Sequence, residues 1–230
     1  MAEPLLEVVA LDVADAQAAV RGGADRLEVV RDMASEGLVP TVETFLAIRD
    51  AVDVPLRVML RSTASFAITE RELDELCALA ATLRRAGMEE CVIGFLTPAG
   101  EVDLSAVQTV LEVAHPRAWT FHRAFDHAAD ATAAWKTITA LDGLDAVLTA
   151  GSPNGLSMTG LCERLSLGTD GPTWVVGGGL RIDHVPALYS EGFRWFHVGR
   201  AVRRHERWDG PVDVVTVRRW REVLDTVSGG

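Results

Sequence analysis

The segment from Thr120 to Asp126 reads Thr-Phe-His-Arg-Ala-Phe-Asp, so an apolar run ends in an imidazole, a guanidinium and a carboxylate. Packing of a hydrophobic core does not require these three polar groups, whereas binding and catalytic residues commonly lie where strands end. His122 can transfer a proton, and Arg123 beside it can bind an anion. We therefore predict a reactive centre at these residues. The alternative is that His122 and Arg123 only form salt bridges at the rim of a barrel.

Two carboxylates interrupt apolar runs nearer the N-terminus. Glu7 has apolar residues on both sides, and Glu28 takes the matching place in Asp-Arg-Leu-Glu-Val-Val. Because side chains alternate along a strand, neighbouring parallel strands would hold both inside a barrel and close together. Paired carboxylates supply a general acid and base or bind a hard cation. Equally, they could neutralise arginines inside the barrel, such as Arg26, Arg61 or Arg123.

Arg61 and His197 extend this set of candidates. Arg61 ends the third apolar run, and together with Arg123 it offers two guanidiniums suited to a carboxylate or phosphate on a substrate. His197, in Trp-Phe-His-Val-Gly, is either a second base or a core histidine. We expect one pocket at the C-terminal face of the barrel to gather the catalytic side chains, which are those of Glu7, Glu28, Arg61, His122 and Arg123.

Two glycine-rich loops follow the last two apolar runs. Gly177, Gly178 and Gly179 come after the seventh, and Gly199 and Arg200 come after the eighth. In many (β/α)8 enzymes the backbone N–H groups of these two loops bind a phosphate. We expect an anion there, although glycines are also what tight turns require.

The elements that must position these residues alternate between short apolar runs and helical patterns along the whole chain. This alternation is typical of a parallel sheet covered by helices. A last helical pattern, beginning near Asp213, follows the eighth run and would close a (β/α)8 barrel. We therefore predict an α/β fold, a TIM-like (β/α)8 barrel forming a single domain over residues 1–230. The expected strands are 5–11, 25–30, 55–61, 90–95, 117–122, 144–149, 172–177 and 194–198.

Composition excludes several classes of function. The net charge of −11 argues against binding to a phosphate backbone, which requires clustered positive charge. No stretch has the length of a membrane span or the pattern of a signal peptide, so we expect a cytoplasmic protein that contacts no membrane. Lys136 is the only lysine and falls within a helical pattern, which argues against an imine-forming aldolase.

The three cysteines give no metal or disulfide signal. Cys77, Cys91 and Cys162 are odd in number, far apart, and without C-x-x-C spacing or a neighbouring histidine. We interpret all three as buried thiols.

Several segments together resemble the CutC family, which is named for copper homeostasis. They are Gly23-Ala-Asp-Arg-Leu-Glu28, Gly37-Leu-Val-Pro-Thr41, the Thr120 to Asp126 segment and Leu148-Thr-Ala-Gly151. The resemblance implies a TIM-barrel fold, a cytosolic homo-oligomer and a role in copper handling, but no established reaction. Family members often carry cysteines in the first two strands, where this chain has Val9, Ala10 and Val30. Because thiolates select Cu(I), copper as a ligand is implied by the resemblance alone.

Three functions therefore stay open at this point. The first is copper binding and homeostasis, as the family name implies. The second is an enzyme that acts by acid/base chemistry on a small, phosphorylated or otherwise anionic metabolite. The third is a structural or regulatory oligomer without a reaction, because a fold does not dictate a function. The expected partner is a small-molecule anion or a metal ion, and no nucleic acid.

Overall fold

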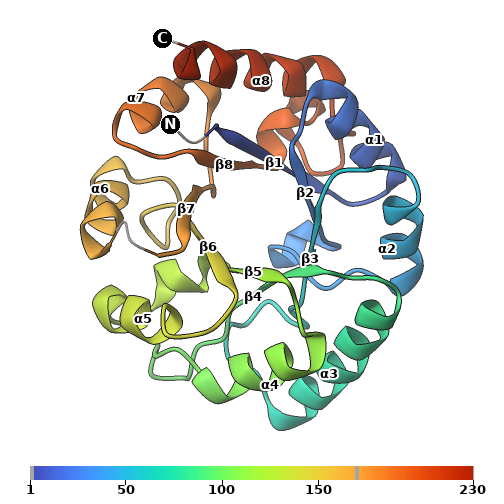
Figure 1. Ribbon diagram of the computed structural model, residues 1–230, viewed down its shortest axis with the longest axis vertical. Helices are drawn as coiled ribbons and strands as arrows, with labels where there is room; N and C mark the ends of the chain where they lie inside the picture. The colour runs from blue at the N-terminus through green and yellow to red at the C-terminus, as the bar shows by residue number, and fades with distance from the viewer. Residues whose placement is uncertain (1–2, 169–170, 230) are drawn as a thin grey trace.

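The computed structural model describes residues 3–168 and 171–229, and its strands form a closed parallel barrel (Figure 1). The strands pair in the order of the sequence, and β8 pairs with β1 to complete the ring. This confirms the predicted TIM-like (β/α)8 barrel. The strands are β1 (Leu5–Ala10), β2 (Arg26–Val29), β3 (Leu56–Met59), β4 (Glu90–Ile93), β5 (Ala118–Phe121), β6 (Leu144–Thr149), β7 (Thr173–Val176) and β8 (Trp195–Val198).

A helix follows each strand and packs on the outside of the barrel (Figure 1). Side-chain caps fix where several of them begin: Thr69 and Glu72 form a capping box at α3, and the Asp213 carboxylate accepts N–H groups of the first turn of α8. The helices are α1 (Val13–Gly22), α2 (Val42–Arg49), α3 (Glu70–Arg85), α4 (Leu104–Ala114), α5 (Ala131–Ile138), α6 (Met158–Leu167), α7 (Val185–Ser190) and α8 (Val214–Ser228).

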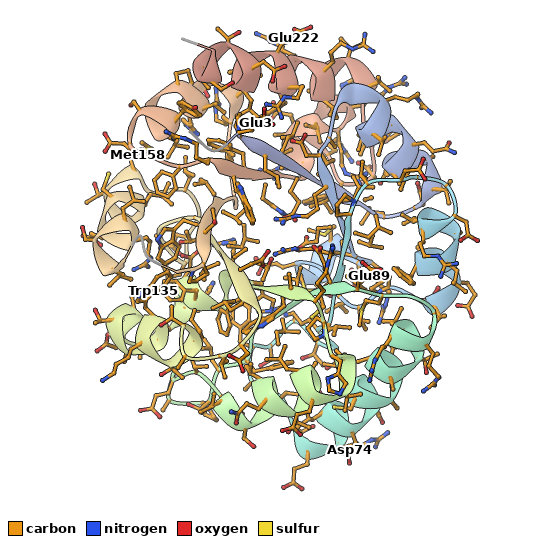
Figure 2. The ribbon with its side chains drawn as sticks, in the orientation of Figure 1. Glu3, Asp74, Glu89, Trp135, Met158 and Glu222 are labelled. Atoms are coloured by element: carbon orange, nitrogen blue, oxygen red, sulfur yellow. The ribbon has the colours of Figure 1, made fainter. Side chains whose placement is uncertain are left out.

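The main hydrophobic core lies between the strands and the helices. On β1, Leu6, Val8 and Ala10 belong to this core, so the alternate residues Glu7 and Val9 point into the barrel. Figure 2 shows side chains filling the interior of the ring, while Asp74 and Glu222 lie on its outer edge. The barrel interior is therefore packed, and what fills it determines the chemistry available there.

Two loops on the C-terminal side of the barrel are held in place by backbone and side-chain hydrogen bonds. Short backbone bridges join Arg31 to Leu38 and Arg203 to Val212, each closing one of the long irregular segments. The buried Arg203 guanidinium also donates to the Asp15 carboxylate of α1. The segments 32–41 and 203–211 thus form a fixed rim around the barrel mouth.

The cysteines lie in three different elements. Cys91 is buried on β4 and faces the helices, Cys77 is half-buried on α3, and Cys162 is exposed on α6. The prediction that all three are buried thiols is therefore wrong for Cys162, because the helical pattern places it on the solvent side of α6.

Within the described part of the chain, none of the helices combines the length and the hydrophobicity needed to cross a bilayer.

Candidate active site

Barrel closure brings Glu7 between an arginine and a histidine. Glu7 pairs in register with Arg26 of β2 on one side and with His197 of β8 on the other. Its Oε2 accepts from Arg26 Nε at 2.5 Å, and its Oε1 lies 2.8 Å from His197 Nδ1. Burial opposes ionisation of Glu7, but Arg26 and then His197 outweigh it and hold the pKa of this carboxyl well below its usual range. His197 therefore donates its Nδ1 proton to Glu7, which leaves Nε2 free for other partners.

Glu28 faces that free nitrogen. It is 4% exposed, and its Oε2 lies 3.8 Å from His197 Nε2, while its Oε1 has no hydrogen-bond partner among the described residues. Burial raises the pKa of Glu28 to about 7, with the His197 charge opposing this shift and the Glu7 charge adding to it. Burial lowers the pKa of His197, but Glu28 and Glu7 together raise it above its usual value. The pair can therefore hold or release a proton near neutral pH.

The residues that cover this group on its C-terminal side differ around the barrel. Val9, Val30, Met59 and Val92 form an apolar cluster that covers the interior of β1 to β4 on the C-terminal side. Directly after β7 the corresponding position is Gly177, where an added Cβ would lie 3.0 Å from His197 Cδ2. The His197 side chain keeps 11% of its surface exposed, against 3% for Glu7. Next to Gly177, which has no side chain, His197 is therefore less covered than Glu7.

A second ionic group closes the opposite, N-terminal end of the interior. Arg57 donates to Glu90 at 3.1 Å and also to Thr120 and Asp145. Arg57 is 1% exposed, and each of its three guanidinium nitrogens donates a hydrogen bond within the protein. This group therefore stabilises the barrel rather than binding a ligand. Our sequence reasoning missed Arg57 and Glu90, although the alternation of β3 and β4 would have placed both side chains inside the barrel.

Arg61 and His122 lie together at the rim, at the ends of β3 and β5. The Phe66 ring contacts both: its centroid is 4.6 Å from Arg61 Cζ and 5.5 Å from the centroid of the His122 ring. His122 is 3% exposed, its Nδ1 accepts the Ala124 N–H at 3.1 Å, and its Nε2 has no partner among the described residues. Burial, with the nearby Arg61 charge, lowers the pKa of His122 to about 3, so the ring is neutral.

Arg123 has a separate set of partners. Its Nε donates to Asp126 at 3.1 Å, and its Nη2 donates to the carbonyl oxygens of Ser152 and Pro153. Four of the five predicted residues therefore form two separate pairs, Glu7 with Glu28 and Arg61 with His122, instead of one group. Arg123 belongs to neither pair and is bound to the loop after β6. Pairing of β2 with β1 adds Arg26 to the first group, and closure of β8 on β1 adds His197.

The glycines of the two loops make room for the chain's own side chains. A Cβ on Gly178 would lie 2.8 Å from Arg123 Nε, and one on Gly199 would lie 2.2 Å from the Trp208 indole. Close packing therefore explains these two glycines without a ligand. Binding of an anion by Gly177–Gly179, Gly199 and Arg200 stays a prediction.

The same central group is the one that could hold a metal ion. Within the described residues, Glu7, Glu28 and His197 place ligand atoms within 4.8 Å of one another. Both Glu7 oxygens are already engaged by Arg26 and His197, however, so only His197 Nε2 and the Glu28 carboxylate are free. Two protein ligands are fewer than the three or four of a typical catalytic or structural metal site. The geometry fits proton transfer better than metal binding.

Comparisons with known proteins agree with the fold and indicate a family. The model of the CutC family matches residues 4–201. A family protein CutC from Klebsiella pneumoniae (strain 342) is 33% identical over 198 residues, which cover 84% of this chain and 78% of that protein. The solved structure of the putative copper homeostasis protein CutC from Streptococcus agalactiae aligns with a TM-score of 0.78 at 21% identity, covering 85% of this chain and 98% of that one.

A more distant similarity concerns the fold alone. Phosphoribosylanthranilate isomerase from Thermotoga maritima aligns with a TM-score of 0.61 at 12% identity, over 97% of this chain and 99% of that one. The barrel is thus one that very different sequences share.

Proposed function

Because this chain belongs to the CutC family and carries an imidazole held between two carboxylates inside its barrel, we propose that it is an enzyme acting by acid/base catalysis on a small anionic metabolite. One observation carries the proposal. His197 Nδ1 is fixed by Glu7, and His197 Nε2 lies 3.8 Å from Glu28 on a side chain that keeps 11% of its surface exposed. A carboxylate that orients an imidazole in this way is the usual device for making its other nitrogen a base.

Each residue of the group has a distinct part in this chemistry. His197 Nε2 takes a proton from a C–H or O–H group of the substrate, and the ionised Glu7 stabilises the imidazolium that results. Arg26 keeps Glu7 ionised through the contact at 2.5 Å. Glu28, with one oxygen unpartnered, returns a proton at a second position of the substrate. The reaction class is therefore an internal proton transfer, such as an isomerisation or epimerisation.

Deuterium exchange tests this proposal even while the product is unidentified. The full-length protein would be incubated in D2O with a panel of hydroxy-carbonyl acids and sugar phosphates, and loss of C–H signals would be followed by proton NMR. We expect exchange with at least one compound and a loss of about 100-fold or more in His197→Gln. Arg181→Gln is the control, because Arg181 is exposed and pairs only with Asp183 among the described residues.

Two results would contradict the proposal. One is the absence of exchange across the whole panel with the wild-type protein, and the other is exchange that His197→Gln leaves intact.

Copper handling is the second candidate, because the similar protein from Streptococcus agalactiae is named for copper homeostasis. The ligand atoms of Glu7, Glu28 and His197 lie within 4.8 Å of one another, so this group is where the barrel could hold a cation. That group contains no cysteine, and carboxylate and imidazole ligands suit divalent ions better than Cu(I). A copper role for this chain would therefore involve Cu(II), bound by His197 and Glu28.

A further inference from the structure

Arg61 differs from the other deeply buried arginines. Four arginines are at least nine-tenths buried among the described residues: Arg26, Arg57, Arg61 and Arg203. Three of them contact a carboxylate, on Glu7, on Glu90 and Asp145, and on Asp15 respectively. Arg61, at 3% exposure, contacts no carboxylate of the described residues. A buried charge is normally paired, so a partner for this guanidinium is missing.

The hydrogen bonds that Arg61 does make leave its charge uncompensated. Nη1 lies 3.4 Å from the Ser35 carbonyl oxygen and 3.5 Å from that of Glu36, and Nη2 donates to the carbonyl oxygen of Ala64. These acceptors are neutral backbone groups in the loops after β2 and β3. The Nε–H group has no partner in the part of the chain that the structure describes. Arg61 therefore offers a free Nε–H group, a second N–H on Nη2 and a full positive charge.

His122 supplies a further free donor beside it. Because its Nδ1 accepts the Ala124 N–H, the proton of the neutral ring resides on Nε2. No acceptor for this Nε2–H exists among the described residues, although the atom is fully buried. A buried donor without an acceptor lowers the stability of the folded protein. Two such donors lie beside the same Phe66 ring, so one ligand with several acceptor oxygens could satisfy both.

We propose that Arg61 and His122 bind one oxyanion group, the carboxylate or phosphate of a small molecule. The Arg61 Nε–H and the His122 Nε2–H each donate one hydrogen bond, and the guanidinium charge pairs with the anion. This deepens the proposed function, on which it rests for the statement that the molecule is the substrate.

Arg61 is a better anion partner than Arg123 or the glycine loops. Arg123 is already neutralised by Asp126, and the spaces beside Gly178 and Gly199 hold the side chains of Arg123 and Trp208. Phe66 covers the Arg61–His122 pair from the segment 62–68, so a bound anion would be shielded from water. Shielding strengthens a charge-assisted hydrogen bond.

Titration calorimetry of the full-length protein with inorganic phosphate, and separately with acetate, tests the inference. We expect one of the two anions to bind, which identifies the class of oxyanion. Arg61→Met should weaken binding by about 10- to 100-fold, and His122→Asn by about 2- to 10-fold. The larger effect is expected at Arg61 because its guanidinium is charged, and a hydrogen bond from a charged donor contributes more than one from the neutral His122 ring. The asparagine oxygen can still accept the Ala124 N–H. Arg181→Gln, a change of one exposed positive charge, should bind as the wild type does.

Binding of neither anion, or binding that both variants leave unchanged, would overturn the inference. If Arg61→Met does not fold, nitrogen NMR of the wild-type protein decides the matter, since the resonances of Arg61 Nε and His122 Nε2 should both shift on titration. Neither shifting would also overturn it. Arg61-dependent anion binding without deuterium exchange would uphold this site and reject the proposed catalysis. Deuterium exchange without anion binding would support the proposed catalysis and reject the anion site at Arg61 and His122.

Discussion

At the scale of single residues, Glu7 and Glu28 differ in how many of their carboxylate oxygens are in use. Glu7 has both oxygens bound, by Arg26 and by His197, and is held ionised. Glu28 has one oxygen without a partner among the described residues and one 3.8 Å from an imidazole nitrogen, so its proton is weakly constrained. In the proposed reaction, two carboxyl groups of the same chemical type thus take the roles of orienting group and proton carrier.

The free energy of unfolding is expected to fall as the pH rises through the titration of Glu28. Its pKa rises from 4.5 to about 7 on folding, so its stabilising contribution is complete below 4.5 and is lost as the pH passes 7. His197, whose pKa is also raised, acts in the same direction. Glu28→Gln should remove on the order of 1–3 kcal/mol of this pH dependence. Urea unfolding at pH 5, 6, 7 and 8 measures it, with the exposed Glu222→Gln as control. Equal pH slopes in wild type and Glu28→Gln would show that Glu28 does not titrate in this range.

At the scale of elements, the loop after β8 and the segment 203–211 are packed against each other. Trp208 of that segment lies against Gly199, and Arg203 Cζ lies 5.3 Å from the Trp208 ring centroid. Arg203 in turn donates to Asp15, and Asp15 also accepts the Val212 N–H. The segment therefore serves as a fixed wall of the barrel mouth, and Gly199 is the residue that lets the indole approach.

Gly199→Ala should destabilise the protein by about 1–3 kcal/mol, because the added methyl group would overlap the Trp208 indole. Thermal or urea unfolding of Gly199→Ala, Trp208→Ala and the double variant measures the effect. The double variant should be more stable than the sum of the single effects predicts. Strict additivity would show that the two residues do not interact.

At the scale of the whole molecule, the surface and the interior point to a small ligand. The net charge of −11 disfavours a polyanion, while the positive charges that matter are buried inside the barrel or at its rim. Exposed large apolar residues lie singly on three helices, as Leu104, Met158 and Val215. The homo-oligomer implied by the family resemblance stays a prediction.

Tight binding of Cu(I) is not expected. The three cysteines lie on α3, β4 and α6, and burial raises the pKa of the Cys91 thiol to about 12, so it does not provide a thiolate. Competition against a Cu(I) chelator, in wild type and in a variant with all three cysteines replaced by serine, measures this directly. Tight stoichiometric binding that is lost in the variant would establish a cysteine site and restore the role in copper handling.

The sequence by itself determined the barrel and part of the site. Strand and helix periods are local properties, so they predicted eight βα units, and alternation along β1 and β2 predicted that Glu7 and Glu28 point inward. The family motifs around Glu28 and His122 are also short stretches of sequence, so they could be found without the structure.

Tertiary structure alone decided which side chains meet. His197 joins Glu7 only because β8 closes on β1, across 190 residues of sequence. Arg61 meets His122 only because β3 and β5 end at the same rim beneath Phe66, and Trp208 occupies the space beside Gly199. A residue's own sequence neighbourhood sets its direction, whereas its partners depend on closure, register and loop packing, which bring distant segments of the chain together.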